Sequence, residues 1–220
     1  MKLTVATFNI HHGEGSDGRR DLERTAAAML ATGAELIALQ ELDRNFRRSD
    51  HVDQPAVLAE LTGLRVHFRP TVRRGGGEYG IALAAADDLE VDLRTLPRES
   101  AEEGRGAILT SWREIRVVGV HLATQRAARR LQLPALVELA APSKNPVVVL
   151  GDLNASHREL RPLGRDGLDT GPGRAPTARS RLGSRRIDHV LAGGGARVLR
   201  TWTVPGDASD HLPLVAHVAT

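Results

Sequence analysis

Five short motifs lie at one end of apolar runs that have the composition of buried β-strands. Each motif places Asn, Asp, Glu or His beside residues with high strand propensity, such as the run VVVL before GDLN. Because a sheet brings the ends of distant strands together, we expect these polar side chains to meet in one site. The motifs are TFNIHHG (7–13), LQEL (39–42), GDLN (151–154), RIDHV (186–190) and SDH (209–211).

Two helical patterns interrupt the strand-like runs of the first third of the chain. Residues 21–33 repeat apolar side chains at helical spacing, with Asp21 as the expected N-cap. Residues 54–62 do the same, with Asp53 as the expected N-cap and Gly63 as the stop signal. Together with the strand-like runs that flank these helices, the pattern indicates an α/β fold.

A third helix is predicted for about 125–141. Pro134 lies inside it, and an interior proline costs about 3 kcal/mol, so we expect a kink or a late helix start. The segment 164–186 is interpreted as a loop because Gly, Pro and Arg dominate it. No repeat of fixed period and no internal boundary is visible, so one domain spanning 1–220 is expected.

Strand-like runs account for most of the remaining sequence. They fall within 64–122 and near 146–152, 187–192, 196–204 and 212–218.

The absence of cysteine restricts the chemistry. Disulfides and thiolate metal sites are excluded, so a metal must be held by oxygen or imidazole ligands. The opening run MKLTVATFNI is too short for a signal peptide or a membrane helix, so we expect a cytoplasmic protein without membrane insertion. No obligate protein partner is expected.

The LQEL motif offers the first choice of metal ligand. Glu41 follows the apolar run 35–40, so the backbone would carry it to the edge of the sheet. A hard cation such as Mg²⁺ takes one or two protein carboxylates and could neutralise a phosphoryl group. The alternative is a solvent-facing residue after a strand, and Asn9 has a similar alternative as the polar end of the first strand.

The GDLN motif follows the clearest buried strand of the chain. A tight turn at Gly151 would project Asp152 and Asn154 from the same strand end. Asp152 could accept a proton from water, and Asn154 could orient a phosphate without adding negative charge. An Asx turn is the purely structural alternative.

Histidines supply the proton chemistry. His211 in SDH can move a proton or donate to phosphate, and Asp188 in RIDHV is the carboxylate expected to fix its tautomer. His121, at the end of the run IRVVGVHL, is a second phosphate donor or a structural residue. The other histidines are interpreted as structural, with a functional role considered only for His11 and His12, which flank the site in sequence.

In their order and their position beside apolar strands, these motifs resemble the endonuclease/exonuclease/phosphatase superfamily, which has the DNase I-like fold. The resemblance extends from Thr7 to about Val218. It implies a four-layer α/β sandwich of two mixed β-sheets packed face to face with flanking helices. The site is then expected where strand ends of both sheets meet.

The resemblance also implies roles for individual residues. Asn9 and Glu41 resemble the metal-proximal pair, with Asp210 near the same Mg²⁺ or Mn²⁺. Asp152 and Asn154 resemble the pair that handles protons and orients phosphate. The number of ions, one or two, and the identity of the general base stay open.

The remaining roles are assigned in the same way. His211 and Asp188 resemble the histidine–carboxylate couple, and His121 the second phosphate-contacting histidine. The tract GGGEYGIAL resembles a family segment that bears a site residue. It suggests Glu78 as a partner for His121 and Tyr79 as a phosphate contact, while Arg105 in GRGAIL resembles a family arginine that binds phosphate.

Arginine clusters bear on the substrate. The net charge is only +3, but almost every cation is arginine. Three clusters adjoin the motifs and could form a cationic rim for a polyanion, or could be solvated loops of an arginine-rich chain. The clusters are Arg44, Arg47 and Arg48; Arg69, Arg73 and Arg74; and Arg179, Arg181, Arg185 and Arg186.

The leading hypothesis is a Mg²⁺- or Mn²⁺-dependent phosphodiesterase that acts on nucleic acid. The six aromatic residues form no visible lipid-binding hairpin and no row of base-stacking platforms. A phosphatase or a sphingomyelinase-like phospholipid-headgroup hydrolase is the alternative. A catalytically inactive binding module is a further one, although the full set of site residues argues against it.

Overall fold

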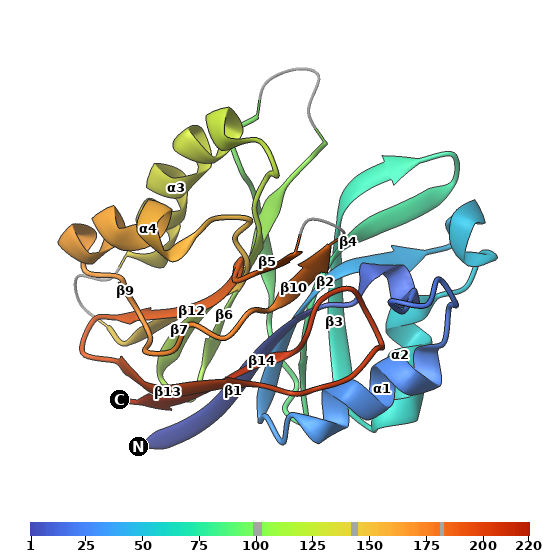
Figure 1. Cartoon of the computed structure of the whole chain (residues 1–220), viewed down its shortest axis with the longest axis horizontal. Helices are drawn as coiled ribbons and strands as arrows, with labels where there is room; N and C mark the ends of the chain where they lie inside the picture. The colour runs from blue at the N-terminus through green and yellow to red at the C-terminus, as the bar shows by residue number, and fades with distance from the viewer. Residues whose placement is uncertain (99–102, 142–144, 181–182) are drawn as a thin grey trace.

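Two six-stranded mixed β-sheets pack face to face, and helices cover the outer face of each (Figure 1). This is the four-layer α/β sandwich expected from the resemblance. The helices are α1 (Leu22–Ala31), α2 (Gln54–Thr62), α3 (Arg126–Ala140) and α4 (His157–Leu160), with short 3₁₀ turns η1 (His11–Gly13), η2 (Arg47–Ser49) and η3 (Arg161–Asp166). The computed structural model describes residues 1–98, 103–141, 145–180 and 183–220.

The first sheet has the strand order β13-β14-β1-β2-β4-β3. Strands β1 and β2 are parallel, and the other pairings in this sheet are antiparallel. The bounds are β1 (Lys2–Asn9), β2 (Leu36–Arg44), β3 (Arg65–Arg74), β4 (Gly77–Ala85), β13 (Arg197–Thr203) and β14 (Leu214–Ala219).

The second sheet has the order β5-β6-β7-β8-β12-β9, with β7 and β8 parallel. A separate hairpin pairs β10 with β11. The bounds are β5 (Asp92–Thr95), β6 (Gly106–Trp112), β7 (Ile115–His121), β8 (Val147–Asp152), β9 (Asp169–Thr170), β10 (Ala178–Ser180), β11 (Gly183–Arg185) and β12 (Asp188–Gly193).

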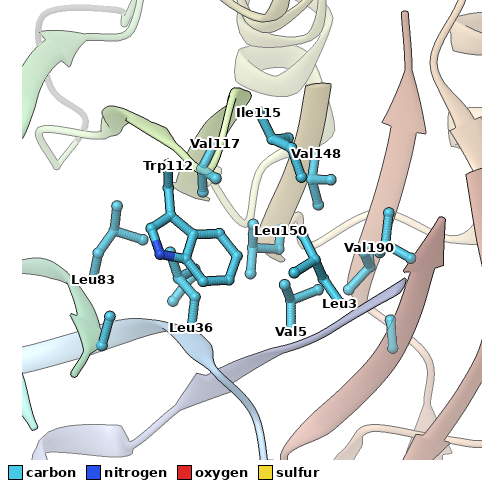
Figure 2. Packing of buried hydrophobic residues seen from close by; sticks show 14 of the residues in the cluster. Leu3, Val5, Leu36, Leu83, Trp112, Ile115, Val117, Val148, Leu150 and Val190 are labelled. Carbon is cyan, nitrogen blue, oxygen red and sulfur yellow. The ribbon is translucent and has the colours of Figure 1, made fainter. Parts of the chain in front are cut away.

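The central strands are buried on both faces, which explains their continuous apolar sequence. In β1, Leu3 and Val5 point between the sheets, whereas Ala6 and Phe8 pack under α1 and α2. In β8 the same alternation separates two faces: one contributes to the layer between the sheets and the other packs against α3. Figure 2 shows the layer between the sheets, where Trp112 lies among side chains from both sheets.

The predicted caps are confirmed. The side chain of Asp21 accepts from the backbone N–H of Arg24, and that of Asp53 accepts from Ala56. Gly63 ends α2 with φ of +69°, a conformation that costs glycine little.

Helix α3 corrects the expectation of a late start, because it runs continuously from Arg126 through Pro134. Its N-terminal half is anchored by tertiary contacts: the Gln132 side chain accepts from the N–H of Ala123 and donates to the carbonyl of Pro97. These contacts outweigh the local propensity of the sequence.

The predicted loop 164–186 also contains short strands. Two residues of β9 extend the second sheet beside β12, and β10 is fastened to the SDH motif by a hydrogen bond from Arg179 N–H to the Asp210 carbonyl at 2.8 Å. Strands this short carry no apolar periodicity, so no pattern in the sequence predicts them. Arg181 of the third arginine cluster lies outside the described residues.

Within the described residues, the structure contains no helix with the length and apolar character needed to cross a membrane.

Glycine is required where β8 approaches β7. A Cβ at Gly151 would lie 1.9 Å from the carbonyl oxygen of Val120, far inside any tolerated contact. The residue that follows is Asp152, so this close strand approach fixes the position of the GDLN motif.

His189 of β12 holds the turn that follows β8. Its Nε2 donates to the carbonyl oxygen of Ala155 at 2.9 Å, and the ring is buried. Burial lowers the pKa of His189 to about 4, although the Ala155 hydrogen bond acts in the opposite direction. The ring is therefore neutral in the folded protein at neutral pH, as its structural interpretation requires.

We expect Gly151→Ala to destabilise the protein by roughly 1–3 kcal/mol or more, because β7 and β8 must move apart. Urea unfolding measures the change. Gly206→Ala is the matched control, since a Cβ there meets no atom within 4 Å and its φ is not in the left-handed region. It should shift stability by no more than about 0.5 kcal/mol. Equal unfolding midpoints for the two variants would contradict the packing argument.

Acidification should destabilise the fold through His189. The unfolded ring binds a proton below its ordinary pKa of 6.5 and the folded ring only below about 4, so stability falls as pH decreases between these values. The full effect is on the order of 3 kcal/mol. Comparing wild type with His189→Asn from pH 7 to 4 isolates this contribution, because other groups titrate in both proteins. Parallel curves would exclude it.

Candidate active site

Four polar residues occupy inward-facing positions at one end of their strands: Asn9, His121, Asp152 and Asp188. In β1 the positions that face the second sheet are Leu3 and Val5, and the same alternation leads to Asn9. In β8 it leads through Leu150 to Asp152. His121 ends β7 and pairs in register with Asp152, and Asp188 begins β12 opposite the same residue. The site is thus the polar end of the layer between the sheets.

Asn9 links the two sheets. Its side-chain Nδ2 donates to Glu41 Oε1 at 2.9 Å and to Asp152 Oδ2 at 3.1 Å, and its Oδ1 accepts from the backbone N–H of His11 at 3.0 Å. Its own carbonyl accepts from Ser209 Oγ at 2.8 Å. All polar atoms of this buried side chain are engaged, so it positions both carboxylates.

Glu41 reaches the site because strand β2 contains a β-bulge. The register with β4 shifts between Gln40 and Leu42, and Glu41 has φ of +63°. Regular alternation would place Glu41 on the helix side with Leu39; the extra residue turns it inward. A left-handed backbone conformation is unfavourable for glutamate, so the surrounding structure must offset its cost. Such strained residues are concentrated at functional sites.

Asp152 and Asn154 form an Asx turn. Asp152 Oδ1 accepts from the N–H of Asn154 at 2.9 Å, and Asn154 Nδ2 donates to the carbonyl of Leu122 at 3.0 Å. The structural alternative considered for GDLN is therefore present. It leaves Asp152 Oδ2 directed toward Asn9, so the turn and a functional role are compatible.

His211 pairs with the carboxylate expected from the sequence. Its Nδ1 lies 2.8 Å from Asp188 Oδ2, and its Nε2 lies 3.8 Å from Asp152 Oδ2. Burial disfavours the protonated ring, but Asp188 and Asp152 outweigh it and raise the pKa of His211 to about 10. Burial and the nearby Asp188 raise the pKa of Asp152 to about 7. The site can therefore hold a charged imidazolium beside a carboxyl group that titrates near neutral pH.

His121 has the opposite electrostatic environment. Its Nδ1 accepts from the guanidinium of Arg105 at 2.9 Å, and its Nε2 lies 3.6 Å from Asp152 and 3.9 Å from Glu41. Burial, then Arg105 and His211, hold the pKa of His121 well below its ordinary value. The same guanidinium nitrogen of Arg105 also lies 3.3 Å from Nε2, so Arg105 faces both ring nitrogens of His121.

Glu78 is not the partner of His121, which corrects that expectation. Its carboxylate binds Arg44 and Arg73, with Arg73 Nε at 2.9 Å. Successive residues of a strand point to opposite faces, so Tyr79 points between the sheets with Ile81 and Glu78 does not. Burial and the neighbouring Glu41 raise the pKa of Tyr79 well above its ordinary value, so its hydroxyl stays protonated beside the site.

Asp210 lies at the exposed edge of the cluster. Its Oδ1 is 3.7 Å from His11 Nδ1 and 3.3 Å from Ser209 Oγ, and its side chain is 44% exposed. Two groups of described residues bring three possible metal-ligand atoms within 4.8 Å of one another. They are Asp152, Asp188 and His211, and His11, His12 and Glu41. Asp210 belongs to neither group, whereas Glu41 belongs to the second.

Three arginines of the first two clusters bind carboxylates. Arg48 binds both oxygens of the buried Asp43 at 2.7 and 2.8 Å, while Arg44 and Arg73 bind Glu78. Arg69 donates to main-chain carbonyls. Among the described residues no carboxylate lies within 4.0 Å of Arg47, Arg69 or Arg74, so these two clusters are neutralised only in part.

Arg186 of the third cluster lies near His157 together with two arginines outside the cluster, Arg161 and Arg174. Arg186 leads into Asp188 and lies near Arg174, and burial and Arg174 lower the pKa of Arg186. Arg174 contacts His157 Nε2 at 2.9 Å. Among the described residues no carboxylate lies within 4.0 Å of Arg161, Arg174 or Arg186. A pocket of about 330 Å³ beside them is lined by His157, Arg161, Asp169 and Arg174 among others.

Sequence reasoning missed several supporting residues. Ser209 donates to Asn9 and accepts from the N–H of His211 at 3.0 Å, and its place in the SDH motif could have identified it. Thr177 Oγ1 accepts from the N–H of Asp188 at 3.1 Å, and the cationic pocket gathers His157 and Arg174. Thr177 and Arg174 stand in irregular segments, and His157 begins the single-turn helix α4, so none of the three carries a periodic signal.

Comparison with known proteins supports this architecture. A model of the endonuclease/exonuclease/phosphatase family matches residues 6–211. No match to a curated protein sequence was found.

Solved structures share the fold at low sequence identity. An endonuclease/exonuclease/phosphatase from Beutenbergia cavernae DSM 12333 has a TM-score of 0.80 and 22% identity, covering 99% of this chain and 71% of that chain. A mannosyl-6-phosphatase from Bacteroides thetaiotaomicron VPI-5482 has a TM-score of 0.74 and 17% identity, and the match covers 99% of this chain and 100% of that chain. Truncated TDP2 from Caenorhabditis elegans has a TM-score of 0.70 and 17% identity, and the match covers 100% of this chain and 98% of that chain.

The family match covers nearly the whole chain, and the two-sheet fold with its polar strand ends agrees with it. The chain therefore belongs to the endonuclease/exonuclease/phosphatase family, whose members are metal-dependent phosphoester hydrolases.

Proposed function

We propose that this protein is a divalent-metal-dependent phosphodiesterase, with nucleic acid as the favoured substrate class. The observation that carries the proposal is the convergence of Glu41 and Asp152 on one amide of Asn9, beside His121 and His211. Carboxylates, an imidazolium and a neutral imidazole in one buried cluster supply the groups that phosphoester hydrolysis needs.

The donor set fits a hard cation. Glu41 and Asp152 offer oxygens on either side of the Asn9 amide, and no Arg or Lys of the described residues lies within 4.0 Å of Glu41. We propose that Glu41 holds Mg²⁺ or Mn²⁺, with Asn9 and Asp210 close to the ion. When bound, the ion would neutralise phosphoryl charge and lower the pKa of a coordinated water.

The chain's own residues divide the remaining work. His211, charged and held by Asp188, donates to a phosphoryl oxygen. Asp152, with its pKa near neutrality, accepts a proton from the attacking water. His121, held by Arg105, makes a second contact to phosphate. Asn154 and Tyr79 lie beside this group as further proposed phosphate contacts.

The uncompensated arginines favour a polyanionic substrate. Arg186 and Arg174 extend from Asp188 toward the pocket that contains His157 and Arg161. A nucleic-acid strand carries regularly spaced phosphates that such cations can bind. A phosphatase is the second candidate, because the fold of the mannosyl-6-phosphatase matches this one closely.

We expect His211→Ala and Asp152→Ala each to lower kcat at least ~10²-fold, because each removes a proposed proton-transfer or phosphate-donating group. Initial rates with Mg²⁺ or Mn²⁺ measure the loss, and circular dichroism verifies folding. His217→Ala, remote from the site on β14, is the control and should retain wild-type turnover. Near-normal kcat in either site variant would remove that residue from the mechanism.

The substrate class is tested with a panel of plasmid DNA, DNA and RNA oligonucleotides, an abasic-site duplex, sphingomyelin and sugar phosphates, each with Mg²⁺, Mn²⁺ or EDTA. We expect metal-dependent cleavage of nucleic acid. Arg174→Ala should weaken nucleic-acid binding and reduce its salt slope by roughly 1, whereas Arg65→Ala on the far end of β3 should not.

Other outcomes of the panel have definite meanings. Hydrolysis of a sugar phosphate with all nucleic acids intact would replace the nuclease proposal with the phosphatase. Hydrolysis of sphingomyelin alone would favour the headgroup hydrolase. No hydrolysis of any substrate, with either metal, would favour an inactive binding module.

A further inference from the structure

The proposed mechanism makes no use of the two histidines that follow β1. His11, His12 and Gly13 have φ of +46°, +45° and +77°, so three successive residues adopt left-handed backbone conformations. The turn is fixed from several sides. Asn9 Oδ1 accepts from His11 N–H, and the buried Gln54 of α2 donates to the His12 carbonyl at 2.7 Å.

This turn presents the histidines to Glu41. One ring nitrogen from each histidine and one carboxylate oxygen of Glu41 lie within 4.8 Å of one another. Ligands that each bind a cation at about 2.0–2.2 Å lie roughly 3–4 Å apart, so small side-chain rotations would bring all three onto one ion. Asp210 Oδ1, 3.7 Å from His11 Nδ1, is a further oxygen at the same edge.

The environment of His12 resembles that of a metal ligand. Its Nδ1 is buried and has no hydrogen-bond partner among the described residues. Its other nitrogen, Nε2, lies 3.6 Å from Glu14 Oε2. A ligating histidine commonly directs its second nitrogen to a carboxylate in this way. An unpaired buried nitrogen is costly, and a bound cation would satisfy it.

The surrounding charges permit a cation. The neighbouring guanidinium of Arg48 is bound by both oxygens of Asp43, which offsets part of its charge. An open pocket of about 350 Å³ that includes His12 also contains Glu23, Asp50 and Arg20, and Arg20 is paired with Asp50 at 3.2 Å. An ion could approach His12 from this side.

We propose that His11, His12 and Glu41 form a second cation site, which shares Glu41 with the proposed catalytic ion and takes a transition metal of the Mn²⁺ class. Imidazole nitrogen is a ligand for first-row transition metals, of which Mn²⁺ serves as the probe, whereas Mg²⁺ prefers an all-oxygen environment. The inference rests on the proposed role of Glu41 as a metal ligand. If both sites are filled, each chain binds two Mn²⁺ ions.

The test is the binding stoichiometry of Mn²⁺ alone, without substrate, on the full chain freed of metal by chelation. Electron paramagnetic resonance of free Mn²⁺ counts the bound ions, and calorimetry counts Mg²⁺ in parallel. We expect two Mn²⁺ per chain in the wild type, and one in both His12→Asn and His11→Asn. Mg²⁺ binding should be the same in the wild type and in these variants.

His217→Asn is the matched control and should keep two Mn²⁺. A wild-type stoichiometry of one Mn²⁺ would overturn the second site without recourse to any variant, and so would two Mn²⁺ in a folded His12→Asn protein. If His12→Asn does not fold, His11→Asn carries the same comparison.

Glu41→Gln separates this inference from the proposed function. One Mn²⁺ in the wild type that is lost in Glu41→Gln would refute the second site and leave the hydrolase proposal standing. Unchanged Mn²⁺ binding in Glu41→Gln would refute the role of Glu41 in both.

Discussion

The site depends on one side chain, Asn9, whose amide joins two β-sheets. Its Nδ2 donates to Glu41 on β2 and to Asp152 on β8, at the end of the layer where the sheets pack face to face. Two carboxylates that would otherwise repel each other are held by one donor. The positions of β1, the bulge in β2 and the turn after β8 are thereby set relative to one another, and the surrounding groups pack against that frame.

The charge of each histidine in the site is set by its own neighbouring side chains. Asp188 and Asp152 keep His211 protonated, whereas Arg105 and burial keep His121 neutral. Two histidines with the same ordinary pKa thus acquire different charges within one cluster, because different partners face them. This separation gives an acid and a neutral donor to a site that also contains a carboxyl group titrating near neutrality.

The sequence was least informative about which charged side chains pair with one another. Glu78 and Arg105 are separated from the motifs along the chain, yet the fold places Arg105 against His121 and directs Glu78 to Arg44. Similarly, Arg44, Arg48 and Arg73, which are adjacent to motifs, bind internal carboxylates, while Arg174, which no motif marks, lies beside an open pocket. Proximity in sequence does not show which face of a strand a side chain occupies, nor which partner neutralises it.

The sequence alone determined the α/β class, the helix caps at Asp21 and Asp53, and the set of polar strand ends, because these follow from local periodicity and from residue types at the ends of strands and helices. The arrangement in four layers was implied only by the resemblance of the motifs to a known family. Only the tertiary structure decided that a bulge turns Glu41 inward and that α3 continues through Pro134. Both outcomes depend on strand register and on packing between distant segments, and those energies exceed the local preferences that a sequence records.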